Sequence, residues 1–154
     1  MGNRLTVDDA KLSLTAHVRM KGEEVREKYG PVIGWSELMR LLEDRAVCRY
    51  PCEIVFDAAA LQEGEFAFPL AKGARPEEGF TLFVHPIYQS RLDQVPALAL
   101  YQLVVVNYGE FASPLDAEAF GAAALGISVK EYYDLLCEMA DSLEGCADSV
   151  CCCH

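Results

Sequence analysis

The sequence predicts a single α+β domain with a small, mostly antiparallel sheet, one helix packed on it and a C-terminal layer of three helices. Three observations point to this class. Apolar residues recur at every second position in several short segments, a continuous apolar run follows at 97–106, and two segments with helix-end signals come last. A chain of 154 residues, 52% of them hydrophobic, is long enough for one packed core. We expect this domain to span residues 1–145, with a cysteine-rich tail at 146–154.

The N-terminal part is predicted to begin with a strand. Between residues 11 and 21, apolar residues alternate strictly with polar ones, which is typical of a half-buried strand. Residues 22–29 are polar and charged and predict a short helix. Residues 35–46 predict a second helix, whose Leu38, Leu41 and Leu42 form one apolar stripe that would pack on the sheet.

Three further strands are predicted at 52–56, 66–70 and 80–85. Each carries apolar side chains at every second position, so one face of each strand would pack against the core. Glycine-rich, charged segments separate them and predict a turn and an exposed loop. With the segment at 11–21, the sheet would have about four strands.

The run at 97–106 is interrupted only by Tyr101 and Gln102. Such a segment is buried on all sides, either as a helix or as a strand, and its length and its Ala-Leu opening favour the helix. Its ten residues are about half of the roughly 20 that are needed to cross a bilayer, so we do not expect a membrane span.

The last two helices are marked by their ends. Ser113 and Pro114 provide a cap and a first-turn proline, and Gly126 ends the first of the two helices. Ser128 caps the second, which ends before Gly145. The pair resembles a helix-turn-helix, but its second helix would expose four acidic residues and one lysine, so a plain helical hairpin is expected.

The charge is strongly acidic and unevenly distributed. The net charge is −11, and residues 110–154 alone carry nine acidic residues and one basic residue. This surface repels polyanions, so the composition argues against a nucleic-acid partner and favours a basic protein partner.

The seven cysteines suggest that the protein binds a metal ion. No secretory signal opens the chain, so we expect a cytoplasmic protein with reduced thiols. Four of the thiols and an imidazole lie in the last nine residues, and together they could bind a soft ion such as zinc or copper(I). The alternatives are a reactive tail without metal, and lipidation. The candidate ligands are Cys146, Cys151, Cys152, Cys153 and His154.

Polar residues near the strand ends and within the central apolar run could line a pocket. Tyr101 and Gln102 matter most, because polar groups in an apolar helix need partners and could find them in a ligand. The candidates are Asp57, His85, Tyr101, Gln102, Tyr108 and Glu110. No phosphate-binding loop, dinucleotide fingerprint or serine-hydrolase elbow is present, which favours a non-catalytic protein.

The order of the elements resembles that of small zinc metalloproteases, in which an edge strand and a loop precede a helix that bears H-E-x-x-H. Here Phe83–Ile87 would be the strand end and Tyr101–Val105 would occupy the places of the motif. Tyr101 and Val105 replace both histidines and Gln102 replaces the glutamate, so the resemblance implies a degenerate relative that cannot bind zinc there.

Three hypotheses follow. The first is a non-catalytic cytosolic binding or accessory protein whose thiol tail captures a soft metal ion. The second is an interaction module that presents the acidic helices at 114–143 to a basic partner. The third is a small-molecule binding domain or enzyme with a pocket around His85, Tyr101 and Glu110.

Overall fold

The computed structural model of the protein describes residues 7–143. Within them, five α-helices and a three-stranded sheet form an α+β domain, so the predicted fold class is confirmed. In order along the chain, the elements are α1 (Val7–Tyr29), α2 (Trp35–Leu42), β1 (Cys52–Phe56), β2 (Ala67–Ala71), β3 (Phe80–Val84), α3 (Val95–Tyr108), α4 (Pro114–Leu125) and α5 (Val129–Leu143).

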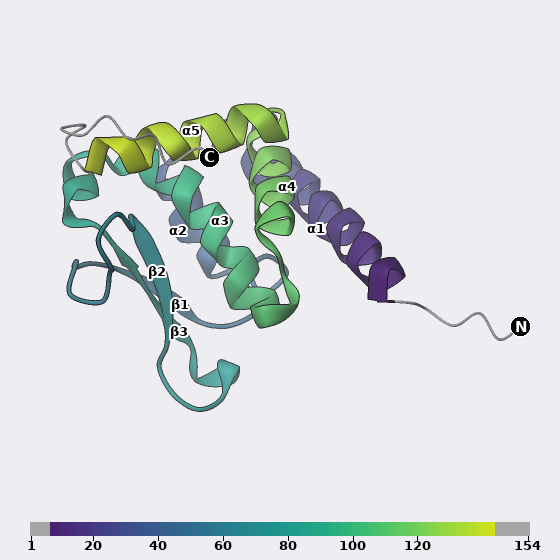
Figure 1. Ribbon diagram of the computed structural model, residues 1–154, viewed down its shortest axis with the longest axis horizontal. Helices are drawn as coiled ribbons and strands as arrows, with labels where there is room; N and C mark the ends of the chain where they lie inside the picture. Colours follow the sequence, from purple (N-terminus) through teal and green to yellow (C-terminus); the bar gives the residue numbers. More distant parts are fainter. Residues whose placement is uncertain (1–6, 144–154) are drawn as a thin grey trace, which may run out of the picture.

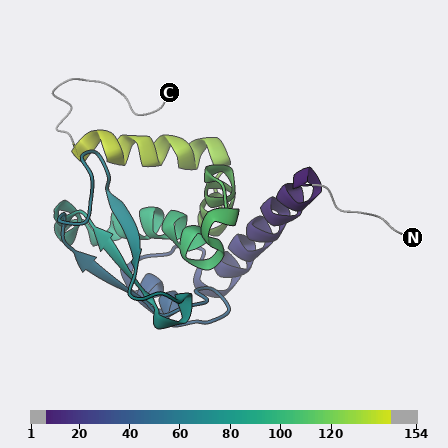
Figure 2. The same ribbon diagram turned by 60° about the horizontal axis from the view of Figure 1, so that its bottom comes forward.

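Helix α3 is the centre of the fold. It packs against α4 on one side and against β2 and β3 on another, and Figures 1 and 2 show the sheet at one side of α3 and α1 beyond α4. Eleven of its fourteen residues are buried. The prediction of a buried helix at 97–106 is therefore confirmed, even though three consecutive valines also suited a strand.

The sheet is mixed, with strand order β1-β3-β2. β1 runs parallel to the central β3, and β2 pairs with β3 in the antiparallel direction. The three strands predicted after residue 50 are present, within one residue of their expected bounds. The expectation of about four mostly antiparallel strands was wrong in number, because the segment at 11–21 is helical, and one of the two strand pairs is parallel.

Helix α1 corrects the prediction of a strand at 11–21 followed by a short helix. Its buried residues Val18, Gly22, Val25 and Tyr29 are three or four residues apart, which is the helical repeat. Of the residues that suggested a strand, Ala16 and Met20 are exposed. The alternation was therefore coincidental, and it concealed a helical stripe that runs across Gly22.

Gly22 is a packing site rather than an element boundary. A Cβ atom built at Gly22 would lie 2.5 Å from the Phe120 carbonyl oxygen and 2.8 Å from the Ala123 Cβ atom. The missing side chain lets α1 approach the backbone of α4 closely. Tertiary packing therefore explains why a glycine occurs in the middle of a long helix.

The predicted start and end of α4 and the predicted start of α5 are confirmed, whereas the predicted end of α5 before Gly145 borders residues outside the described range. The Ser113 hydroxyl accepts a hydrogen bond from the Asp116 amide, and the Asp116 carboxylate accepts one from the Ser113 amide. Gly126 ends α4 in the left-handed conformation (φ 73°). Ser128 and Glu131 form the same reciprocal cap at the start of α5. Helix α2, expected over 35–46, ends at Leu42.

Among the described residues, no helix is both long enough and apolar enough to cross a membrane.

Candidate functional site

The three residues of α3 that are not buried form a single stripe. Tyr101, Val105 and Tyr108 lie four and three residues apart, and the remaining residues of the helix are buried. This stripe is where the central helix meets the surface. Tyr101 lines two neighbouring cavities, one towards α4 and α5 and one towards the start of β3.

The first cavity, which we term the Glu118 cavity, has a volume of about 320 Å³. Side chains from α3, α4 and α5 meet there with the segment that leads into β2. Its polar lining consists of Tyr101, Gln102, Glu118, Tyr133 and Glu65, and its apolar wall includes Phe66, Leu136 and Ala140. Two tyrosines, a carboxamide and two carboxylates thus converge on one small space.

Gln102 is the most informative residue of this cavity. Its side chain is only 8% exposed. Within residues 13–143 the Gln102 carboxamide makes no hydrogen bond. Every fully buried polar side-chain atom in the same range has a hydrogen-bond partner, so the carboxamide atoms are not fully buried. The Gln102 amide is therefore neither satisfied by the protein nor sealed from solvent, and it lines the cavity. Because solvent reaches the amide, a ligand in the cavity could replace water as its hydrogen-bond partner.

The electrostatics of the cavity are dominated by Glu118. Partial burial raises the pKa of this carboxyl group above its usual value. Burial also raises the pKa of Tyr101, and the negative charge of Glu118 adds to that effect. The second carboxylate is already engaged, because Glu65 accepts a hydrogen bond from the Gln62 amide at 2.8 Å. Glu118 is therefore the carboxylate left available for a ligand.

The second cavity, the Tyr108 groove, has a volume of about 590 Å³ and lies on the other side of Tyr101. Its lining is mainly apolar and aromatic, with Glu110 as its single acidic residue. It includes Tyr50, Phe80, Tyr101, Val105, Tyr108 and Glu110. Two of these rings, Tyr50 and Phe80, lie 6.1 Å apart between centroids.

The structure thus brings together four of the six predicted pocket residues. Tyr101 shares one cavity with Gln102 and the other with Tyr108 and Glu110.

The other two predicted residues lie elsewhere. His85 lines a separate hollow with Gln62 and Glu63, and its Nδ1 atom accepts a hydrogen bond from the Ile87 amide at 3.2 Å, capping a short 3₁₀ helix. Asp57 is exposed and accepts a hydrogen bond from the Ala59 amide in a turn after β1. Both residues have local structural roles.

Sequence reasoning missed Glu118 and Tyr133. Glu118 lies near the capped start of α4, two residues after another acid, and Tyr133 lies on the amphipathic α5 beside a second tyrosine, so neither was singled out. They reach Tyr101 and Gln102 only because α4 and α5 fold back onto α3. The polar interruption of an apolar helix identified the α3 half of the cavity, and nothing in the sequence identified the other half.

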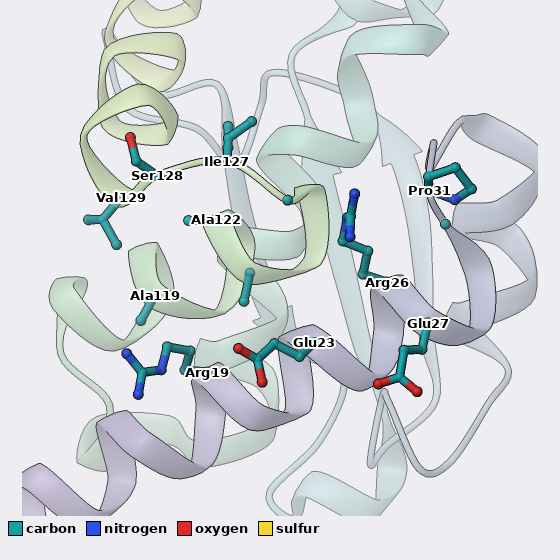
Figure 3. Close-up of a pocket in the computed structure, with 13 residues that line it drawn as sticks. Arg19, Glu23, Arg26, Glu27, Pro31, Ala119, Ala122, Ile127, Ser128 and Val129 are labelled. Atoms are coloured by element: carbon teal, nitrogen blue, oxygen red, sulfur yellow. The ribbon is translucent and has the colours of Figure 1, made fainter.

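A further hollow, of about 740 Å³, lies between α1 and the segment from Ala119 to Val129. Figure 3 shows Arg19, Glu23, Arg26 and Glu27 along α1, facing small residues of α4. A Cβ atom at Gly126 would lie 2.3 Å from Arg26 Nε, so this arginine covers the C-terminal end of α4, where a cation is favourable. The charges of the two arginines and the two glutamates cancel, so the hollow does not favour a ligand of either charge.

The predicted metal ligands Cys146, Cys151, Cys152, Cys153 and His154 lie outside the described residues. Between residues 7 and 143, no group of three or more His, Cys, Asp or Glu side chains could hold a metal ion. Cys48 and Cys52 are free thiols. Cys137 is disulfide-bonded, which differs from the expectation that all thiols are reduced.

The resemblance to small zinc metalloproteases finds no support in the strand order. β3, which leads into α3, is the central strand of the sheet and not an edge strand. No family model, curated protein or solved structure matches this chain.

Proposed function

We propose that the protein is a non-catalytic interaction module that binds a basic segment of a partner protein, and that the Glu118 cavity receives an arginine or lysine side chain of that segment. The observation that carries the proposal is Gln102, which is 8% exposed and whose unsatisfied carboxamide lines a cavity that also contains a carboxylate.

The chemistry of the cavity favours a cation with several hydrogen-bond donors. Glu118 offers a carboxylate, Gln102 a carbonyl oxygen, and both tyrosines offer hydroxyl oxygens and π-faces. Arginine and lysine carry donors only, and their charge is attracted by carboxylates and by aromatic faces. A bound cation would also stabilise the ionised form of Glu118, which burial disfavours.

Helix α5 also carries exposed acidic residues outside the cavity that suit a basic partner. Glu131, Asp134 and Glu138 are exposed on α5, and of these only Asp134 has an ion-pair partner among the described residues, Lys130 at 2.8 Å. The negative electrostatic field of these exposed carboxylates would speed the encounter with a basic segment. The carboxylate of Glu118, inside the cavity, would provide specificity. The acidic interaction module expected from the sequence would thus bind its basic partner through one anchoring site, the Glu118 cavity.

The proposal can be tested by titrating ¹⁵N-labelled full-length protein with a hexa-arginine peptide. We expect chemical-shift changes centred on Tyr101, Gln102, Glu118 and Tyr133, and an affinity that falls as the salt concentration rises. Glu118→Gln should weaken binding about tenfold or more, because a hydrogen bond to a charged group contributes about 1.5–3 kcal/mol.

Glu138→Gln is the matched control. It removes the same charge from an exposed position of α5 outside the cavity, so we expect an effect below about twofold, as for exposed ion pairs. Gln102→Leu should weaken binding without any change in net charge. Equal losses in Glu118→Gln and Glu138→Gln, with shifts spread along α5, would show general electrostatic attraction and overturn the proposed anchor.

The thiol-rich tail supports a second proposal, that Cys146, Cys151, Cys152, Cys153 and His154 hold a soft metal ion. The support is compositional: four thiols and one imidazole in nine residues. Elemental analysis of protein purified without oxygen or chelator, beside a variant that ends at Gly145, tests it. Near-stoichiometric zinc or copper in the full chain alone would support a tail site, and no metal in either protein would remove it.

A further inference from the structure

Two free thiols lie in one short segment between α2 and β1. Cys48 is fully buried, whereas Cys52, the first residue of β1, is partly exposed. Three residues separate them, and the third is Pro51. Among the described residues these are the free cysteines, and neither belongs to the Glu118 cavity or the Tyr108 groove.

Side-chain interactions hold both sulfur atoms close to the bend between α2 and β1. The Cys48 thiol donates to the Tyr50 carbonyl oxygen at 3.2 Å, and the two thiols interact with each other, which lowers the pKa of Cys48 and raises that of Cys52. Both side chains face inwards, because Cys48 belongs to the core and Cys52 packs against it. The two sulfur atoms are therefore neighbours in the folded state, before any change in the protein.

The backbone on both sides of the pair is fixed. The Cys48 amide donates to the Asp44 carbonyl oxygen at 2.8 Å, and the Phe80 amide donates to the Pro51 carbonyl oxygen at 2.8 Å. Between them, the Arg49 amide donates to the side chain of Asn107 at 2.8 Å. The segment is thus tied to α2, β3 and α3, which keeps the thiols together.

The interaction between the two thiols favours thiolate formation at Cys48, against the opposing effect of burial. The hydrogen bond from Cys52 lowers the pKa of Cys48, and the nearby Arg45 contributes to this shift. Because a thiolate is the nucleophile in thiol oxidation, the lowered pKa favours reaction at Cys48, and the partly exposed Cys52 is the thiol of the pair that lies towards solvent.

We propose that Cys48 and Cys52 form a redox-active dithiol that a peroxide converts into an intramolecular disulfide. One thiolate attacks hydrogen peroxide, which breaks the O–O bond, leaves a sulfenic acid and releases water after protonation. The second sulfur then forms the S–S bond and displaces the sulfenic oxygen as water. In total, two thiols and one peroxide give one disulfide and two waters, and a thiol reductant reverses the change.

The disulfide would link the segment after α2 directly to the first residue of β1. Arg49 and Tyr50 lie inside the five-residue loop that it closes, and the Tyr50 ring lines the Tyr108 groove. Oxidation would thus fix the groove wall next to the candidate binding site, although the dithiol itself does not depend on that function.

Tryptic mapping can test this unambiguously because of where the basic residues fall. Cleavage after Arg45, Arg49 and Lys72 places Cys48 in peptide 46–49 and Cys52 in peptide 50–72. The other five cysteines all lie in peptide 131–154. A covalent link between peptides 46–49 and 50–72 therefore identifies the Cys48–Cys52 disulfide by mass alone.

The experiment treats folded, reduced full-length protein with about stoichiometric hydrogen peroxide, blocks the remaining thiols in denaturant, and digests without reductant. We expect the linked pair to change from undetectable to the main form of both peptides and to disappear after reduction. Cys52→Ser, at the partly exposed position, should abolish the link while the circular dichroism spectrum is retained. Recovery of both peptides as separate alkylated or over-oxidised species, or links to peptide 131–154 instead, would overturn the proposal.

Discussion

The ring of Tyr132 lies directly against the backbone of Gly121. A Cβ atom built at Gly121 would be 2.2 Å from the Tyr132 Cζ atom, and the Tyr132 hydroxyl donates a hydrogen bond to the Ala97 carbonyl oxygen at 2.5 Å. One fully buried side chain of α5 thus joins α4 to the start of α3. The same packing places Glu118 and Tyr133 beside Tyr101, so the candidate cavity depends on it.

Gly121→Ala should destabilise the protein by about 1–3 kcal/mol, as expected for overpacking, despite a gain of roughly 1 kcal/mol in helix propensity. Urea unfolding measures the change. In a Tyr132→Leu background the ring is gone, so the same substitution should cost much less. An equal cost in both backgrounds would show that the contact between Gly121 and Tyr132 is not responsible.

Tyr132→Phe should lower the free energy of unfolding by about 0.5–1.5 kcal/mol, because it removes the hydrogen bond to Ala97 and keeps the ring. Tyr133→Phe is the neighbouring control. Its hydroxyl makes no hydrogen bond within residues 13–143, and we expect a change below that range. Similar losses for the two variants would contradict the assigned role of the Tyr132 hydroxyl.

Asn107 is buried at the end of α3 and supports the chain that leads into β1. Its Oδ1 atom accepts from the Arg49 amide at 2.8 Å, and its Nδ2 atom donates to the Val47 carbonyl oxygen at 2.8 Å. Asn107→Leu leaves both backbone groups without these partners, at about 1–3 kcal/mol for each buried group. Chemical denaturation measures the loss, and a loss below about 1 kcal/mol would mean that water replaces both bonds.

Asp44 should make stability depend on pH in the acidic range. Hydrogen bonds from Lys28 (2.6 Å) and Tyr29 (2.8 Å) lower its pKa from 3.8 to about 2. Since the folded-state pKa lies below the unfolded value, Asp44 stabilises the fold above pH 3.8, and this contribution is lost as the pH falls through about 2. Asp44→Asn should therefore be less stable than the wild type at neutral pH.

That difference should shrink towards pH 2, and urea midpoints measured from neutral pH down to about pH 2 would show it. Asp93→Asn, at an exposed position, is the control and should follow the wild-type curve. A difference between Asp44→Asn and the wild type that stays constant with pH would assign the effect to packing and not to the charge.

Pro69 lies on β2, one of the two edge strands of the sheet, and protects that edge. The His85 amide donates to the Phe66 carbonyl oxygen, and the Lys72 amide donates to that of Gly79. In an antiparallel ladder, the backbone groups of successive residues point alternately towards and away from the neighbouring strand. Those of Phe68 and Leu70 therefore point towards β3, and those of Pro69 point away from it, towards solvent. A proline there removes the middle donor from the edge, which disfavours pairing with another strand.

Pro69→Val restores this donor between the exposed Phe68 and Leu70, so we expect concentration-dependent self-association in sedimentation velocity runs. Pro76→Ala, at an exposed loop position, should behave as the wild type. A Pro69→Val protein that sediments as the wild type at every concentration would show that the edge is protected by something else.

The sequence by itself determined the α+β class, the positions of the three strands, the buried helix around 97–106, both ends of α4 and the start of α5. These features follow from local signals: alternation at period two, unbroken apolarity, and caps such as Ser113 and Gly126. It also identified Tyr101 and Gln102, because polar residues stand out within an apolar run.

Only the tertiary structure decided the rest. The alternation at 11–21 predicted a strand, whereas the segment forms part of α1, which packs closely against α4 at Gly22. The parallel pairing of β1 with β3 and the meeting of Glu118 and Tyr133 with Gln102 join residues far apart in the chain. Local sequence patterns carry no information about such long-range contacts, because these contacts depend on how whole helices and strands pack against one another.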